Sequence, residues 1–314
     1  MEPYIANRFG LMRAITGTGL SVAPIGVDGG VFGWVSGQKE TASMLDAFRD
    51  AGGNLVYTAD HFAGGRSEVM IGSWLRSRGS AGMVVATTIG RHPDARGLAP
   101  RIVARATEAS LRRLGVDRID LLTLDGDDPT VPLDDTLEAL DMLCRAGKVG
   151  HVAVLDHAAA RIRAMDTRSE EARYPRVAAI FNEYSLVMRG AFERELAPYV
   201  ATTGTAFFAR RPLANGFLTG LYRDKGAAVD SPIWSKALAH IDRRGLRVLD
   251  RLEVVAKEHD ASPARVAAAW AISKPGVTAA IVAAHSTEEL LDVMHARQMA
   301  LTRQQVAALD AASD

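Results

Sequence analysis

From about residue 20 to its end, the chain alternates short β-rich runs with amphipathic helical patterns. Helical patterns such as residues 40–52, 99–115 and 136–148 place apolar residues at i, i+3 and i+4. This alternation favours parallel strands joined by right-handed helical crossovers. With seven or eight such helices, it predicts an α/β fold, a (β/α)8 TIM barrel. The eight expected strands span residues 22–28, 54–59, 83–88, 119–124, 151–155, 177–181, 205–209 and 278–283.

Two segments fall outside this alternation. Residues 12–22, "MRAITGTGLSV", predict a short β-hairpin that turns at its glycine-rich centre and plugs the bottom of the barrel. Residues 221–238 are long and irregular, carry Gly, Pro and Trp, and predict a lid-like loop after the seventh strand. Since no linker divides the chain, residues 1–314 are expected to form one barrel domain.

Composition narrows the partners. Lys plus Arg and Asp plus Glu number 37 each, so no excess of basic charge favours nucleic acid. The N-terminus has no basic segment followed by an apolar run, and no apolar stretch is long enough to cross a bilayer. The single cysteine, Cys144, excludes an internal disulfide and any thiolate cage. We therefore expect a soluble cytoplasmic protein that binds a small molecule.

Four stretches carry a family resemblance. They are "AGGNLVYTADHFAGGRSEVMIG", "ASLRRLGVDRIDLLTLD", "FNEYSLVMR" and "RPLANGFLTGLY", in this order along the chain. Their text and spacing resemble the aldo-keto reductase superfamily over nearly the whole chain. The resemblance implies a (β/α)8 barrel that reduces carbonyls with NADPH. It also implies an Asp, Tyr, Lys and His tetrad at the C-terminal mouth, with Tyr as the proton donor.

Carried over position by position, the resemblance places other residues where the tetrad should be. The Asp falls on Tyr57, the Tyr on Phe62, the Lys on Thr88 and the His on Asp125. Phe62 has no hydroxyl and cannot act as a general acid. No lysine occurs between Lys39 and Lys148, so a shift of a few residues does not recover the third-strand Lys. The sequence therefore predicts that the redox tetrad is lost.

The positions that hold the cofactor in the resembled family are also changed. Leu155, Asp156 and Phe181 stand where the family has the Ser-Asn pair and the Gln that bind the carboxamide. After the last strand, His285 replaces the Arg for the 2′-phosphate and Glu289 replaces a Gln, so a bidentate cation is lost and a carboxylate gained. No NADPH cofactor is therefore expected.

Strand ends at the top of such a barrel project into its mouth, where ligands bind. We expect Asp125, Tyr57 and Asp28 to be the candidate catalytic groups, because a carboxylate in such a pocket needs a partner or a raised pKa. Asp127 and Asp128 are read as turn formers, His157 as a surface residue beside a helix cap, and no metal site is expected. The candidate substrate-binding residues are Trp34, His61, Phe62, Thr88, Asp156 and Arg210.

Three functions from different classes remain open. A cofactor-independent enzyme would use Asp125 or Tyr57 for acid-base dehydration, isomerisation or cyclisation of an oxygenated metabolite. A non-catalytic member would use the barrel as a binding or assembly partner. An atypical NADPH-dependent carbonyl reductase would need both a proton donor and a cofactor cradle. The new ionisable groups at the mouth favour the cofactor-independent enzyme.

Overall fold

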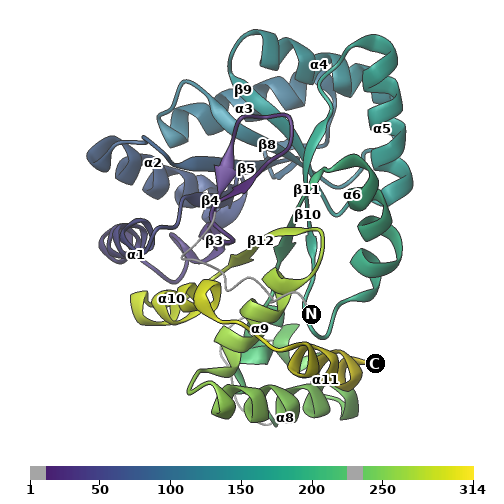
Figure 1. Ribbon diagram of the computed structural model, residues 1–314. Coiled ribbons are helices and arrows are strands. Elements are labelled where there is room, and N and C mark those ends of the chain that lie inside the picture. Colours follow the sequence, from purple (N-terminus) through teal and green to yellow (C-terminus); the bar gives the residue numbers. More distant parts are fainter. Residues whose placement is uncertain (1–11, 225–235) are drawn as a thin grey trace.

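Eight parallel strands close into a barrel in the computed structural model, which describes residues 12–224 and 236–314. The order around the barrel follows the chain, from the first strand to the last and back to the first (Figure 1). The expected TIM barrel is therefore confirmed. Its strands are β3 (Ile25–Asp28), β4 (Leu55–Ala59), β5 (Val84–Ile89), β8 (Ile119–Asp125), β9 (Val149–Leu155), β10 (Val177–Glu183), β11 (Ala206–Arg210) and β12 (Val277–Val282).

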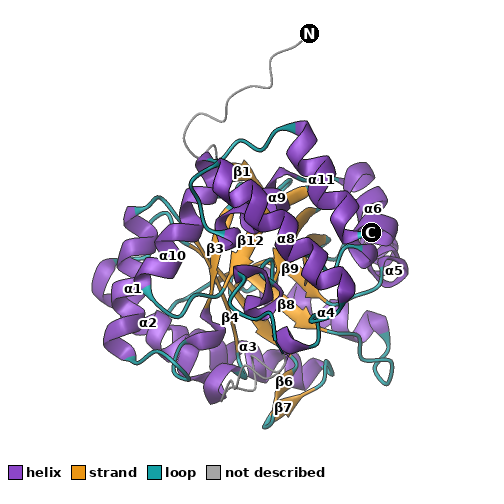
Figure 2. Ribbon diagram, turned by 90° about the horizontal axis from the view of Figure 1, so that it is seen from below, coloured by secondary structure: helices purple, strands orange, loops and turns teal. Residues whose placement is uncertain are grey.

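Helices surround the strands on the outside, as Figure 2 shows with helices in purple and strands in orange. Helix α3 buries one stripe of residues, among them Val103 and Leu114, and ends at Gly115, whose left-handed φ of 65° suits glycine. The helices are α1 (Gln38–Asp50), α2 (Arg66–Arg78), α3 (Pro100–Leu114), α4 (Leu133–Arg145), α5 (Ala159–Ala172), α6 (Ala197–Thr203), α8 (Arg243–Glu258), α9 (Pro263–Ser273), α10 (Thr287–Met294) and α11 (Arg303–Ser313).

The predicted plug is confirmed. Strands β1 (Arg13–Ala14) and β2 (Ser21–Val22) form an antiparallel hairpin, and Ile15 packs into the barrel interior. One boundary was wrong, because Val22 belongs to the hairpin and the first barrel strand begins only at Ile25, after Pro24. Most of the expected lid, residues 221–238, lies outside the described residues.

Side chains alternate between the inside and the outside of the barrel along each strand. Phe181 and Phe208 stack inside with ring centroids 4.6 Å apart, and Tyr57 lies against Phe181 at 5.0 Å. Five alanines lie in the same interior, and their small side chains leave space for the three aromatic rings. The interior is therefore a packed core below the mouth, and the interior position at the end of each strand faces the mouth. The alanines are Ala86, Ala153, Ala179, Ala206 and Ala279.

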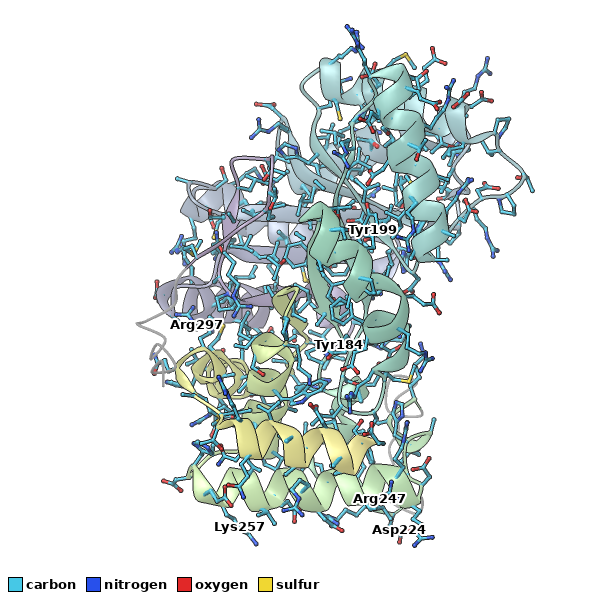
Figure 3. The ribbon with its side chains drawn as sticks, turned by 45° about the vertical axis from the view of Figure 1, so that its right-hand side comes forward. Tyr184, Tyr199, Asp224, Arg247, Lys257 and Arg297 are labelled. Atoms are coloured by element: carbon cyan, nitrogen blue, oxygen red, sulfur yellow. The ribbon has the colours of Figure 1, made fainter. Side chains whose placement is uncertain are left out.

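Two tyrosines marked in Figure 3 fasten outer segments to the barrel. The Tyr184 hydroxyl donates to Glu193 Oε1 at 2.8 Å, and its ring stacks on Trp270 of α9. The Tyr199 hydroxyl on α6 donates to Asp166 of α5. These contacts hold the helices after β9 and β10 in place.

A second small hairpin rises where β5 ends. It consists of β6 (Arg91–His92) and β7 (Ala95–Arg96), which pair antiparallel at the edge of the molecule in Figure 2. Because it follows the C-terminal end of a barrel strand, it lies on the side of the mouth. This hairpin brings Arg91 to the candidate site.

Candidate functional site

Five side chains from five strands form the mouth layer, defined here as Asp28, Tyr57, Thr88, Asp125 and Arg210. Each stands at an interior position near the C-terminal end of its strand. Tyr57 and Thr88 are fully buried, Asp28 and Arg210 are 8% and 7% exposed, and the Asp125 side chain is 6% exposed. The sequence-predicted catalytic residues therefore share one layer with Thr88 and Arg210.

Tyr57 lies at the centre of the mouth layer. Thr88 Oγ1 donates to Tyr57 Oη at 2.9 Å, and the guanidinium of Arg210 lies 5.2 Å from the centre of the Tyr57 ring. Phe62 meets the same ring edge-on at 6.2 Å. Burial raises the pKa of Tyr57 to about 12 although the charge of Arg210 opposes this shift. Tyr57 is therefore a hydrogen-bonding group that keeps its proton at neutral pH.

Asp28 caps the short helical turn η1 (Gly29–Val31). Its Oδ1 accepts the backbone N–H of Gly30 at 2.9 Å. Burial raises the pKa of Asp28, and the charge of Arg210 and the Gly30 N–H oppose the shift without cancelling it. The carboxyl group is thus held in place by the backbone while its charged form is disfavoured.

Asp125 ends β8 and has a partner on the second hairpin. Arg91 Nε lies 2.8 Å from Asp125 Oδ1, an ion pair by distance whose N–H does not point along the contact. Burial raises the pKa of Asp125, and the charge of Arg91 opposes it. The cation nearest to Asp125 is therefore Arg91 and not Arg210. Sequence reasoning missed Arg91, because only the hairpin geometry brings it back across the mouth.

Arg210 is the charged side chain of the mouth layer that lacks a close polar partner among the described residues. Within residues 12–224 and 236–314 it donates no hydrogen bond and has no carboxylate oxygen within 4 Å, and its buried Nε has no partner. The charges of Asp28, Asp156 and Asp125 act on it only from a longer distance. Its pairing partner in this layer is the face of an aromatic ring.

The loop after β4 supplies three further side chains. His61 Nδ1 lies 3.2 Å from Asp60 Oδ1, and the His61 ring meets Phe62 edge-on at 5.0 Å. Asp60 is 1% exposed, and its second carboxylate oxygen is buried and has no hydrogen-bond partner in the described part of the chain. Asp60 orients His61 beside the mouth layer. His61 and Phe62 were expected here and Asp60 was not, although an Asp-His pair directly after a strand is a signal in the sequence.

The other expected ligand-binding residues lie further out. Trp34 is 62% exposed and makes no ring contact with the described residues, so it does not belong to the buried mouth layer. The loop that carries it is held by backbone bonds to Val31 and leaves the indole in solvent. Asp156 is exposed with a φ of 54°, and its backbone N–H donates to Asn182 Oδ1 at 3.0 Å. Both residues stand at the rim.

His157 corrects one expectation. It was expected at the surface, but it is 4% exposed, and its Nδ1 contacts the backbone oxygen of Leu155 at 2.9 Å. Burial lowers its pKa. Asp127 and Asp128 behave as loop residues: Asp127 pairs with Arg161 at 2.8 Å, and Asp128 accepts the Leu98 N–H at 2.9 Å.

Two of the three positions that the resemblance assigns to the nicotinamide, Leu155 and Phe181, offer no polar side chain, and the third holds the exposed Asp156. Leu155 is 3% exposed, and Phe181 is fully buried in the aromatic stack. Neither side chain can hydrogen-bond a carboxamide. At the start of α10, Glu289 Oε2 accepts the backbone N–H of His285 at 2.9 Å, so the two residues that replace the phosphate contacts bind each other. The side chains at these positions do not fit an NADPH molecule held in the manner of the resembled family.

Neither of two surface cavities lies at the mouth. The larger, of about 560 Å³, borders the plug and includes Arg13 and Gly204. The smaller, of about 470 Å³, lies between α4 and α5 and includes Asp134 and Arg168, which pair with each other.

Among the described residues no group of three or more His, Cys, Asp or Glu side chains could hold a metal ion. No helix in the same residues is long and apolar enough to span a membrane.

A closed parallel barrel with polar residues at its C-terminal mouth defines the (β/α)8 barrel class. The family described as "Aldo/keto reductase family" matches residues 28–314, so the chain belongs to it. Several relatives cover most of both chains. An "Uncharacterized oxidoreductase YrpG" from Bacillus subtilis (strain 168) is 28% identical over 302 residues, 91% of each chain. "Aldo-keto reductase str7" from Strobilurus tenacellus is 28% identical over 296 residues, 92% of this chain and 85% of its own.

Another relative is named for an assembly and not for a reaction. A "Probable voltage-gated potassium channel subunit beta" from Oryza sativa subsp. japonica is 29% identical over 270 residues, 82% of each chain. The chain is thus similar both to proteins named as oxidoreductases and to a protein named as a channel subunit. These names point to a family of oxidoreductases. They do not say which reaction the residues at this barrel mouth carry out.

Proposed function

We propose that this barrel is a cofactor-independent enzyme that carries out acid-base chemistry on an oxygenated small molecule at its mouth. One observation carries the proposal: Asp28, Tyr57, Asp125 and Arg210 gather in a single buried layer at the C-terminal ends of their strands. Such a layer is where barrel enzymes place their reacting groups. Two of the four positions where the resemblance places the tetrad hold ionisable side chains of another kind, Tyr57 and Asp125.

The groups of the mouth layer divide into two roles. Asp28 and Asp125 have raised pKa values because of burial, so each can exchange a proton closer to neutral pH than an ordinary carboxyl group. Tyr57 and Arg210 keep their protons and can hold an oxygen atom on which negative charge develops. In a dehydration, one carboxylate would take a proton from carbon and the other carboxyl would protonate the departing hydroxyl as water. No net oxidation occurs in such a step.

Independence from NADPH is the second part of the proposal. Leu155 and Phe181 present hydrocarbon where the resembled family hydrogen-bonds the carboxamide. Glu289 brings negative charge to the start of α10, where a 2′-phosphate would lie in that family. A nicotinamide needs both ends held for hydride transfer. We therefore expect no useful affinity for NADPH or NADH.

A cofactor titration tests this expectation. NADPH and NADH are titrated into the protein while nucleotide fluorescence and the melting temperature are followed, with an active aldo-keto reductase as the positive control. We expect no saturation below about millimolar nucleotide, since that corresponds to only about 4 kcal/mol of binding. Saturation in the low micromolar range would contradict the proposal and favour an atypical NADPH-dependent carbonyl reductase, as the relatives named oxidoreductases suggest.

A non-catalytic binding or assembly partner is the second candidate. The relative named as a channel subunit favours it. The Asp125→Asn variant separates the two, because it keeps size and hydrogen bonding and removes the titration. An enzyme that uses Asp125 would lose turnover while its ligand still bound. A binding module would change its affinity at most.

A further inference from the structure

Among the described residues, the buried guanidinium of Arg210 has no hydrogen-bond acceptor and no ion-pair partner within 4 Å. Other arginines of the barrel lie directly on carboxylates: Arg113 Nε is 2.6 Å from Glu68 Oε2, and Arg189 Nε is 3.0 Å from Glu193 Oε1. Arg210 is more deeply buried than either of them, at 7% exposed, and among the described residues it has no such partner. Its Nε is shielded from solvent and unpaired. An unpaired buried N–H of a charged group destabilises a folded protein, so this arrangement lowers stability.

The fold holds Arg210 in this position. Residues Ala206 and Phe208 of β11 face the barrel interior, and Arg210 follows them at the same alternation, so its side chain enters the mouth. Its guanidinium lies over the Tyr57 ring at 5.2 Å. The ring fixes the guanidinium plane by a cation–π contact and takes up none of its N–H donors. The donors are therefore positioned in advance for an acceptor that comes from outside the chain.

A carboxylate fits these donors best. The planar guanidinium fork matches the two oxygens of a carboxylate in a bidentate pair. One negative charge neutralises the one charge of Arg210. A dianion such as phosphate would leave surplus negative charge in a layer that already contains Asp28 and Asp125. The rings of Tyr57 and Phe62, at 6.2 Å from each other, offer an apolar surface for the remainder of the ligand.

We propose that the mouth binds a small molecule with a single carboxylate group, and that Arg210 is the residue that binds this carboxylate. The inference rests on the proposed function in one respect, that the mouth is the ligand site. It adds the chemical class of the substrate, a monocarboxylic acid. It concerns binding and holds whether or not a particular carboxylate is turned over.

Calorimetric titration with three probes tests the inference. Benzoate carries one carboxylate on an apolar ring, benzamide has the same shape without the charge, and inorganic phosphate is a compact anion that is largely dianionic at pH 7.5. We expect benzoate to bind at one site at least about tenfold more tightly than benzamide or phosphate, because the charged bidentate pair contributes more than about 1.4 kcal/mol. Equal affinity for benzoate and benzamide, or tighter binding of phosphate, would overturn the proposal.

Two variants assign the binding to Arg210. Arg210→Met keeps the length and apolar contact of the side chain, and we expect benzoate affinity to fall at least about tenfold while that for benzamide stays unchanged. Arg211→Met is the matched control, since Arg211 is the next residue, is partly exposed and lies 3.6 Å from Glu183. It should retain benzoate binding within about twofold. Undiminished benzoate binding in folded Arg210→Met would overturn the proposal.

A failure of the carboxylate proposal can be distinguished from a failure of the proposed function. NADPH saturation would contradict cofactor independence and leave the benzoate comparison as it stands. Loss of the benzoate preference would contradict the substrate class and leave the NADPH titration as it stands. The two experiments thus test separate properties of the barrel mouth, its affinity for nucleotide and its affinity for carboxylate.

Discussion

An arginine lies at each end of the barrel, half-buried at the bottom and buried at the top, and the two differ in their hydrogen bonds. At the bottom, Arg13 of the plug donates to the backbone oxygens of Ile272, Val277 and Thr278 at 3.0, 2.8 and 3.3 Å. At the top, Arg210 donates to no group of the described residues. A satisfied arginine contributes to stability, whereas an unsatisfied one is tolerated where it serves a ligand. The hydrogen bonds of Arg13 thus mark the bottom of the barrel as a structural end, and the open donors of Arg210 mark the top as a functional end.

The largest effect is expected when the same substitution is made at both ends. Arg13→Met leaves three backbone oxygens without their donor and should lower the free energy of unfolding by about 2–3 kcal/mol. Arg210→Met removes a buried charge that has no close partner, so the free energy of unfolding should stay within about 1 kcal/mol of the wild type or rise. Urea denaturation followed by circular dichroism measures both.

The relative stability of Arg13→Met and Arg210→Met tests whether the two arginines have different roles. Met is a long apolar side chain in both variants, so differences in packing volume largely cancel. If Arg210→Met destabilised the protein as much as Arg13→Met, Arg210 would have a structural role and the contrast between the two ends would be lost.

A smaller effect is expected from the pH dependence of the mouth. Burial raises the pKa of Asp28 above its value near 3.8 in the unfolded chain, so the folded state holds this proton more tightly. The carboxyl group therefore contributes stability below about pH 3.8, and that contribution is lost as the pH rises through the folded pKa. Asp28→Asn removes the charge and can still accept the Gly30 N–H. We expect this variant to be more stable than the wild type at neutral pH.

The difference in stability should shrink as the pH falls toward about 3.8, because the wild-type carboxyl then becomes neutral as well. Urea midpoints of both proteins between about pH 4 and 8 measure it. Asp46 offers a control with the opposite sign: Arg78 beside it lowers the pKa of Asp46, and Asp46→Asn should destabilise the protein at neutral pH. A wild type more stable than Asp28→Asn at neutral pH would show that Arg210 stabilises the Asp28 carboxylate after all.

The fold could be predicted from the sequence, since each barrel strand is a local run with its own hydrophobic pattern and each helix begins and ends at local signals. The interior position of Tyr57 and Asp125 followed from the same alternation. The partners at the mouth did not follow. Arg91 reaches Asp125 through a hairpin whose path no local pattern encodes, and no local pattern predicts that His157 is buried. Local patterns determine elements, whereas partners depend on how separate elements meet.

The smallest effect is expected from rebuilding the tetrad alone. In the fourfold variant Tyr57→Asp, Phe62→Tyr, Thr88→Lys and Asp125→His, we expect no measurable oxidation of NADPH with a reactive aldehyde or quinone. The reason lies outside the four positions, because Leu155 and Phe181 still present no polar side chain to a nicotinamide. Circular dichroism confirms that the variant is folded, and the single variant Phe62→Tyr, which adds one hydroxyl at a half-buried position, serves as the milder test. Clear turnover in either would show that the mouth still binds the family's cofactor, and the top of the barrel would then be a dormant reductase site.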